Sequence, residues 1–318
     1  MRPVLLSLFG VDLPAYFAML AVGFSLATWT GARQIGRHGL DREVIIDLGL
    51  AMVIAGVIGS RLLHVIADGY FWDYVHLCTD PTKVSWRISE AHCASASVGG
   101  VWDSAQRVCH PREANCFAWA AFWAGGLTYY GGLIGAVGYA AYFLRRERFP
   151  FWRAADMAGF TVALGLAWGR MGCFLAGCCF GVECHDPWAA FFPAWSPASE
   201  SQFKAHRLSA ESLPALPVHP TQLYESLGCL AIAAVAYGVV TPRKRYDGQV
   251  FLFFLGTYSV LRAAVEALRS DDRGGLLGLS TSQLISLAIL AALWPTARYL
   301  RRTADEMRRN GDTAAQTA

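Results

Sequence analysis

The sequence contains little charge. Only 16% of its 318 residues are Asp, Glu, Lys or Arg, whereas soluble proteins carry about a quarter. Hydrophobic residues make up 54% of the chain, and the mean hydropathy is +0.33. The net charge of +3 is too small to indicate a nucleic-acid partner. This composition predicts an all-α polytopic membrane protein.

Two further patterns are missing. The apolar residues 1–10 are followed by Asp12 and Pro14, with no small-residue cleavage site, so we expect an interfacial arm rather than a signal peptide. The chain also has no internal repeat of the kind that secondary transporters use, which argues against a transporter.

Seven apolar stretches are present, and a membrane-spanning helix needs about 20 such residues. The segments between them at 33–42, 145–153 and 243–245, and the one at 298–309, are rich in Arg or Lys and fall on one side of a seven-span arrangement. By the positive-inside rule this side is cytoplasmic. The sequence thus predicts one membrane domain over 1–300, an external N-terminus, external polar loops at 67–126 and 183–218, and a cytoplasmic tail at 301–318. The expected spans are 16–29, 44–66, 127–144, 154–175, 222–240, 250–268 and 282–300.

Cysteines occur in both external regions. The first loop holds Cys78, Cys93, Cys109 and Cys116 without the paired C-x₂-C of zinc knuckles, so we expect two disulfides of open pairing. A second group comprises Cys173, Cys178, Cys179 and Cys184, followed by His185. For this group we also expect disulfides, with inert thiols, a metal site or a reactive thiol as alternatives. The adjacency of Cys178 and Cys179 makes it hard for both to bind one ion.

The stretch from Gly169 to Gly181 closes the fourth span and carries Arg170 among four glycines. An arginine near the end of an apolar span costs a few kcal/mol unless it snorkels, pairs or faces a cavity. Glycines permit positive φ and close backbone approach, which suits a segment that bends around a ligand. Snorkelling with helix-packing glycines is the alternative. Near the start of the same span, Asp156 is expected to cap its helix or to pair with Arg153.

On the predicted topology, polar residues of all the first six spans fall at one level near the outer leaflet. Arg262, Glu266 and Arg269 share one helix face. One glutamate cannot neutralise four arginines, so the excess positive charge indicates a phosphate-bearing ligand. The residues at this level are Tyr16, Arg61, Tyr130, Arg170, His219, Tyr224, Arg262, Glu266 and Arg269.

Five ordered blocks resemble those of the bacterial prolipoprotein diacylglyceryl transferase family, over roughly Pro14 to Ala288 outside the two loops. They are Gly59-Ser60-Arg61, Gly131-Gly132-Leu133-Ile134-Gly135, Gly169-Arg170-x-Gly172-x-Phe174-x-x-Gly177-x-x-x-Gly181, His219-Pro220-Thr221-Gln222-Leu223-Tyr224-Glu225, and Tyr258-x-x-x-Arg262-x-x-x-Glu266-x-x-Arg269 with Ser282-Gln283.

The resemblance implies transfer of the diacylglyceryl group of phosphatidylglycerol to the lipobox cysteine of a prolipoprotein in the bacterial inner membrane, with release of glycerol phosphate. It needs no metal or other cofactor, and membrane lipids and prolipoproteins are the expected partners. The expected catalytic residues are Arg170, Arg262 and Tyr130. The expected substrate-binding residues are Tyr16, Arg61, Gly131, Gly132, Cys173, Gly181, His219, Tyr224, Glu266 and Arg269.

Three residues depart from the family pattern. Tyr130 stands where a histidine is usual, Cys173 where an asparagine is usual, and Cys178 at an acidic position. A tyrosine hydroxyl, with an ordinary pKa of about 10, is a poor base at neutral pH. Two alternatives follow: transfer to a different acceptor, or phospholipid binding without catalysis.

Overall fold

The computed structural model describes residues 4–8, 11–36, 42–86, 88, 90–94, 98–122, 126–210, 212–269, 275–276 and 278–316. The chain forms two compact units. Unit 1 comprises Met1–Ile45 and Phe149–Ala318, and unit 2 comprises Ile46–Arg148. Each unit is described by itself.

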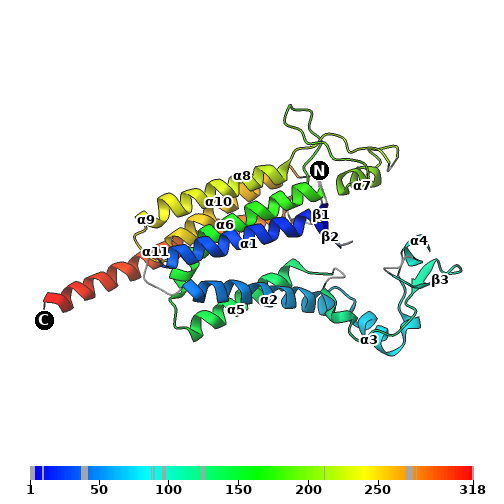
Figure 1. Ribbon diagram of the computed structural model, residues 1–318. Helices are drawn as coiled ribbons and strands as arrows, with labels where there is room; N and C mark the ends of the chain where they lie inside the picture. The colour runs from blue at the N-terminus through cyan, green and yellow to red at the C-terminus, as the bar shows by residue number, and fades with distance from the viewer. Residues whose placement is uncertain are drawn as a thin grey trace. The chain divides into compact units, whose positions relative to one another are not determined.

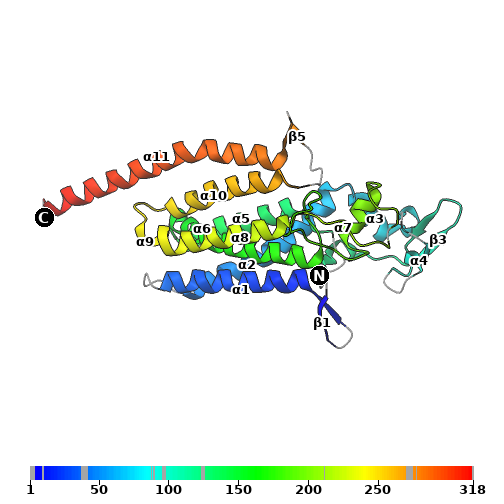
Figure 2. The same cartoon turned by 90° about the horizontal axis from the view of Figure 1, so that it is seen from above.

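Unit 1 is a bundle of long helices. These are α1 (Ala15–Gly36), α6 (Phe151–Ala176), α8 (Thr221–Val235), α10 (Gln249–Glu266) and α11 (Thr281–Gln316). In Figures 1 and 2, α6 lies beside α1, α8 and α10, and α10 lies beside α11. The centre of the bundle is a cluster of Ala163, Ile232, Ala233 and Phe254. A π-helical turn, η4 (Ala236–Val240), and α9 (Thr241–Arg243) continue α8.

Short elements join these helices. β1 (Val4–Leu8) and β2 (Val11–Pro14) form an antiparallel hairpin before α1, and β5 (Gly275–Leu276) pairs with β6 (Leu279–Ser280) before α11. The predicted external loop 183–218 contains α7 (Pro197–Lys204), which begins with a capping box between Ser196 and Ser199.

Asp156 fixes the direction of α6 relative to α10. Its Oδ1 accepts hydrogen bonds from the backbone N–H groups of Val250 (2.9 Å) and Phe251 (3.2 Å), in the first turn of α10. Its Oδ2 lies 2.9 Å from Lys244 Nζ. The N-terminal end of α6 therefore lies beside the N-terminal end of α10, and their C-terminal ends share the opposite end of the bundle. The expectation that Asp156 caps its own helix or pairs with Arg153 is wrong, because the open N–H groups of α10 bind it instead.

Unit 2 pairs α2 (Arg42–Ala67) with α5 (Tyr129–Arg146). Glycines lie where the two backbones meet: a Cβ on Gly59 would lie only 3.1 Å from the Cα of Gly135, and a Cβ on Gly131 would overlap the carbonyl oxygen of Gly59. Such small-residue contacts are typical of helix pairs in membranes.

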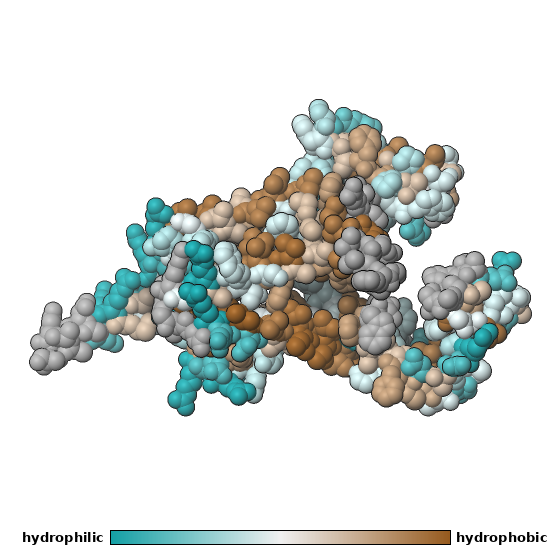
Figure 3. Space-filling model, viewed as in Figure 1, coloured by the Kyte–Doolittle hydropathy of each residue, from teal (hydrophilic) through white to brown (hydrophobic). Residues whose placement is uncertain are grey.

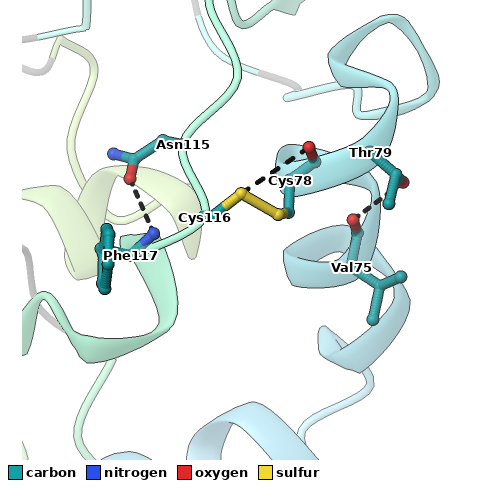
Figure 4. Close-up of a disulfide and its surroundings, with 6 residues drawn as sticks. All are labelled: Val75, Cys78, Thr79, Asn115, Cys116 and Phe117. Atoms are coloured by element: carbon teal, nitrogen blue, oxygen red, sulfur yellow. Dashed lines mark hydrogen bonds between the residues drawn. A yellow bond between two sulfur atoms is a disulfide. The ribbon is translucent and has the colours of Figure 1, made fainter.

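The segment between α2 and α5 is held by two disulfides. It contains α3 (Phe71–Thr79), η1 (Pro81–Lys83), α4 (Glu90–Cys93), the hairpin β3 (Val101–Asp103) with β4 (Val108–His110), and η2 (Ala118–Ala120). Cys78 bonds to Cys116 and Cys93 to Cys109. Figure 4 shows the first bond joining the end of α3 to the stretch of chain just before η2, where Asn115 Oδ1 accepts from the Phe117 N–H at 3.0 Å. The predicted pair of disulfides in this loop is confirmed.

The long helices suit a membrane. Five helical segments among the described residues are long and apolar enough to cross one: Ala15–Gly36, Arg42–Ala67, Phe151–Ala176, Thr221–Arg243 and Thr281–Asn310. Their outward faces carry large exposed apolar side chains such as Phe17, Leu50 and Ile54. Figure 3 shows hydrophobic residues along the helices and hydrophilic residues gathered near their ends. The polytopic all-α prediction is confirmed at this level; α5 and α10, of 18 residues each, occupy the third and sixth predicted spans.

Candidate active site

A buried carboxylate organises the end of unit 1 where α6 and α10 finish and α8 begins. Glu225 in α8 is 1% exposed at its side chain, and its Oε2 lies 2.9 Å from Arg170 Nε of α6. The Tyr258 hydroxyl of α10 donates to Glu225 Oε1 at 2.9 Å. Three helices are thus joined through one carboxylate. Burial of this charge is tolerated because a guanidinium and a hydroxyl compensate it.

Arg262 lies one turn beyond Tyr258 on the same face of α10. Its Nη2 is 2.6 Å from Glu266 Oε2 and donates to Ser282 Oγ of α11 at 3.1 Å. Arg262 and Glu266 are both buried, and Arg262 Nη1 has no hydrogen-bond partner. A buried guanidinium nitrogen without an acceptor is costly, so it marks a place where an anionic group would be bound favourably.

Gly181 joins the chain after α6 to the ends of two other helices. Its N–H donates to the carbonyl of His219 at 2.9 Å, and the next N–H, of Val182, donates to Leu268 O at 2.8 Å. A Cβ at Gly181 would lie 2.8 Å from the Cβ of His219 and would also overlap the carbonyl of Leu268. Glycine is therefore required here for close backbone packing. Arg269 forms an isolated backbone bridge with Gly181, which places it beside this turn.

The first turn of α8 fixes the turn after α6. Thr221 Oγ1 donates to Cys179 O at 2.8 Å, and Gln222 Nε2 donates to Cys178 O at 2.7 Å. Gln222 is 1% exposed, and its Oε1 has no hydrogen-bond partner. The amide therefore presents an acceptor that a donor group of a ligand could satisfy.

Three predicted binding residues border this end of unit 1. Tyr16 is half-buried at the start of α1, where its backbone packs against Gly172 of α6. His219 Nδ1 and the Tyr224 hydroxyl are 3.3 Å apart and form a hydrogen bond. Tyr16 thus contacts α6, and His219 contacts the turn that follows α6 at Gly181; the binding of substrate by these residues stays a prediction.

Cysteines of the second group are all reduced thiols outside any disulfide, as is Cys229. The expected disulfides among Cys173, Cys178, Cys179 and Cys184 are therefore wrong. The first three place their sulfurs within 4.8 Å of one another without a covalent bond between them. Cys184 belongs to a second group, with Asp186 and His219, whose ligand atoms also lie within 4.8 Å of one another, and its thiol donates to Asp186 Oδ2 at 3.4 Å.

Arg61 lies in unit 2, where its guanidinium binds the chain's own oxygens. Its nitrogens donate to the carbonyls of Trp119 (2.7 Å) and Ala118 (2.8 Å), and Nη2 also donates to the Tyr74 hydroxyl at 3.0 Å. These contacts pin the segment before α5 to the end of α2. The geometry gives Arg61 a structural role and does not favour its predicted contact with substrate.

The other predicted residues of unit 2 begin α5. Tyr130 is 59% exposed. Gly131 and Gly132 face the backbone of α2 at Gly59 and Gly56. Their side of the helix is the packing seam, so the two glycines position α5, while the Tyr130 side chain is open to a ligand.

The excess of arginine charge is smaller than predicted, because a second carboxylate, Glu225, joins Glu266 against the four arginines. Glu225 neutralises Arg170, Glu266 neutralises Arg262, and Arg61 is held by backbone carbonyls. Glu266 is the only carboxylate of the site predicted from the sequence, and Glu225 and Tyr258 lie outside that predicted set. A signal was present, because a carboxylate inside an apolar span is a site hypothesis by default.

Comparison with known proteins decides the family. Residues 3–91 and 104–297 match the family described as prolipoprotein diacylglyceryl transferase. The chain belongs to the prolipoprotein diacylglyceryl transferase family. The charged and polar residues converging in unit 1 include Arg170, Glu225, Tyr258, Arg262 and Glu266, all within the matched residues.

Relatives within this transferase family share about the same length. A phosphatidylglycerol–prolipoprotein diacylglyceryl transferase of Clostridium tetani is 27% identical over 287 residues, covering 90% of this chain and 93% of its own. The second such enzyme of Clostridium perfringens is 28% identical over 296 residues, with 91% and 92% covered. That of Bordetella bronchiseptica is 29% identical over 297 residues, with 91% and 92% covered.

Proposed function

We propose that this protein transfers the diacylglyceryl group of phosphatidylglycerol to the cysteine thiol of a prolipoprotein. Family membership and the names of its relatives support the reaction. The observation that carries the site assignment is the buried, unbonded Arg262 Nη1 beside the Arg170–Glu225–Tyr258 group.

In the proposed reaction, the thiolate of the acceptor attacks the carbon of the diacylglyceryl group that is bonded to the phosphate ester oxygen. The carbon–sulfur bond forms as the carbon–oxygen bond breaks, and glycerol phosphate leaves with the bonding electrons. Negative charge grows on the phosphate oxygens during this step. Arg262 Nη1 is assigned to the phosphate, and Arg170, oriented by Glu225, stabilises the developing charge.

Tyr130 is assigned to hold substrate through its hydroxyl. The walls of the substrate site are assigned to Tyr16, Cys173, His219, Tyr224, Glu266 and Arg269. Its backbone framework is assigned to Gly131, Gly132 and Gly181. The thiol proton passes to a base or to water as the thiolate forms.

We further propose that seven helices span the bacterial inner membrane, with the N-terminus outside and the C-terminus in the cytoplasm. The five apolar segments and the two 18-residue helices α5 and α10 supply the spans. Reporter fusions after Arg146 and Arg245 should report a cytoplasmic location, and fusions within 98–122 and 185–210 an external one. The opposite pattern at either pair would reject the orientation.

The reaction is tested with purified protein, phosphatidylglycerol and a lipobox peptide, following glycerol phosphate and peptide mass together. Both products are expected. Lipid consumption without peptide modification would instead indicate a different acceptor, and saturable lipid binding without turnover a non-catalytic protein.

Arg262→Lys tests the phosphate assignment within this assay. Lysine keeps the charge beside Glu266 but removes Nη1, so kcat/KM should fall by about a hundredfold. Arg298→Lys, on the exposed side of α11, is the matched control and should leave kcat/KM unchanged. Equal rates for the wild type and Arg262→Lys would remove Arg262 from the phosphate site.

A further inference from the structure

Three thiols meet at the end of α6. Cys173 lies in the last turn of the helix, and Cys178 and Cys179 lie in the turn that follows. Their sulfur atoms are all within 4.8 Å of one another. None of the three is in a disulfide.

The backbone is shaped to bring them together. Gly177 ends α6 in the left-handed region, at φ 74°, and Cys179 follows at φ 64°. A left-handed conformation costs a non-glycine residue about 1–2 kcal/mol. Thr221 and Gln222 hold the turn by binding the carbonyls of Cys179 and Cys178. The adjacency of Cys178 and Cys179 in the sequence makes it hard for both to bind one ion. In this turn, however, both sulfur atoms lie within 4.8 Å of the Cys173 sulfur and of each other.

The spacing suits a sulfur-bound metal ion. Three thiolates at about 2.3 Å from one ion lie about 4 Å apart, so sulfurs already within 4.8 Å need only small movements to bind it. Thiolate ligands select soft ions such as Cu(I), and also bind Zn(II).

Two arginines lie close to the three thiols. Arg170 lies one turn before Cys173 on α6, and Arg269 is within hydrogen-bonding reach of Cys179. Three thiolates around a divalent ion carry one net negative charge, which the Arg269 guanidinium beside Cys179 offsets.

We propose that Cys173, Cys178 and Cys179 form a binding site for one thiophilic metal ion, Cu(I) or Zn(II). Each thiol that is still protonated gives its proton to water as its sulfur–metal bond forms, and no oxidant or reductant is needed. Cys173 is also assigned to the wall of the proposed substrate site, but binding of the ion needs no lipid transfer and can be measured without it.

The test is a titration of the reduced, detergent-purified full chain with Cd²⁺, whose thiolate complexes absorb in the ultraviolet. One ion per chain should bind, and Cu(I), added against a chromophoric competitor, should bind with the same stoichiometry. Replacing any one of the three cysteines by serine should weaken binding at least about tenfold, or about 1.4 kcal/mol.

Two variants serve as controls. Cys229→Ser changes a buried thiol of α8 outside the cluster, and Cys184→Ser changes the thiol beside Asp186. Both should bind one ion as the wild type does. The melting temperature of each variant checks its fold.

Three results would overturn the proposal: no charge-transfer absorption with the folded wild type, undiminished binding by the triple serine variant, or loss of the ion only in Cys184→Ser. So would mass spectrometry of protein alkylated directly in cells that finds two of the three cysteines joined as a disulfide. Each readout is a binding or mass measurement, so failure of lipid transfer would not produce these results.

Discussion

At the scale of residues, the site is built from charge pairs rather than from unpaired arginines. Glu225 binds Arg170 and Tyr258 together, and Glu266 binds Arg262. A phosphate that reaches Arg170 must share the guanidinium with a carboxylate that is almost wholly buried. Arg262 differs because one of its nitrogens is already unbonded.

Arg170→Ala should therefore lose both activity and stability. It leaves the Glu225 carboxylate buried without its cation, at a cost of about 3–5 kcal/mol. The double variant Arg170→Ala/Glu225→Gln removes both charges, and its glutamine still accepts the Tyr258 hydrogen bond. Thermal unfolding in detergent should show recovery of stability in the double variant, while lipid transfer stays absent. If the single variant is as stable as the wild type, Glu225 is not held by Arg170.

At the scale of elements, α2 and α5 depend on backbone contact at glycines. Gly131 faces the Gly59 carbonyl, whereas a Cβ at Gly138, two turns further along α5, would meet nothing within 4 Å. The two glycines of one helix therefore differ in what a methyl group would meet.

Gly131→Ala should destabilise unit 2 by about 1–3 kcal/mol or more, because its Cβ would push α5 away from α2. Gly138→Ala is the matched control and should stabilise the helix by about 1 kcal/mol. Melting temperatures of the two purified variants, compared with the wild type, measure the contrast. A similar shift in both would place the α2–α5 contact elsewhere.

A second element-scale contact joins the chain between α9 and α10 to α6. Lys244 Nζ lies 2.8 Å from Asp247 Oδ1, and this contact and Arg153 lower the pKa of Asp247 below its ordinary 3.8 although burial opposes the shift. Burial lowers the pKa of Lys244. The contacts with Asp247 and Asp156 outweigh this effect and raise the pKa above 10.5.

A lowered carboxylate pKa stabilises the fold above the unfolded value and loses that effect as the pH falls through the folded value. The raised pKa of Lys244 stabilises the fold fully at any pH below its unfolded value of 10.5. The stability difference between wild type and Asp247→Asn should therefore be constant from about pH 5 to 9 and shrink below about pH 4.

This stability difference should be small, since Asp247 is 36% exposed and solvent screens the pair. Melting curves measure it, with Glu306→Gln on exposed α11 as control. A difference that grows with acid would contradict the assignment.

Helix positions followed from the sequence more closely than the site did. The predicted span 154–175 corresponds to α6 at Phe151–Ala176, because its long apolar run is interrupted only by Asp156 near one end and Arg170 near the other. The helix of the span predicted over 282–300 continues as α11 to Gln316, since apolarity indicates the membrane-spanning part of a helix and not where the helix ends. Arg170 was identified, but its partner Glu225 was not, because 55 residues of chain separate two groups that only packing joins.

At the scale of the whole molecule, both disulfides belong to unit 2, and the cysteines described in unit 1 are reduced thiols. The bonds close segments with sequence separations of 38 and 16 residues. Closing such loops stabilises a fold by about 4 and 3 kcal/mol.

Cys78→Ser/Cys116→Ser should therefore expose the segment between α2 and α5 to protease, while α6, α8 and α10 stay resistant. Cys93→Ser/Cys109→Ser should have the weaker effect, because it opens the shorter loop. Limited proteolysis followed by mass spectrometry of the fragments measures both, with Cys229→Ser as the control. Cleavage first within α6 or α8 would contradict the division into units.

The two disulfides also bear on how the chain is made. On the proposed topology, residues 67–126 cross the membrane as reduced chain, and only outside the cell membrane do they meet an oxidant. Insertion of α2 and α5 must therefore precede covalent closure of the segment between them. A host lacking an external thiol oxidase would insert the helices yet leave this segment open, so the yield of finished protein would depend on the redox enzymes of the compartment rather than on the insertion machinery.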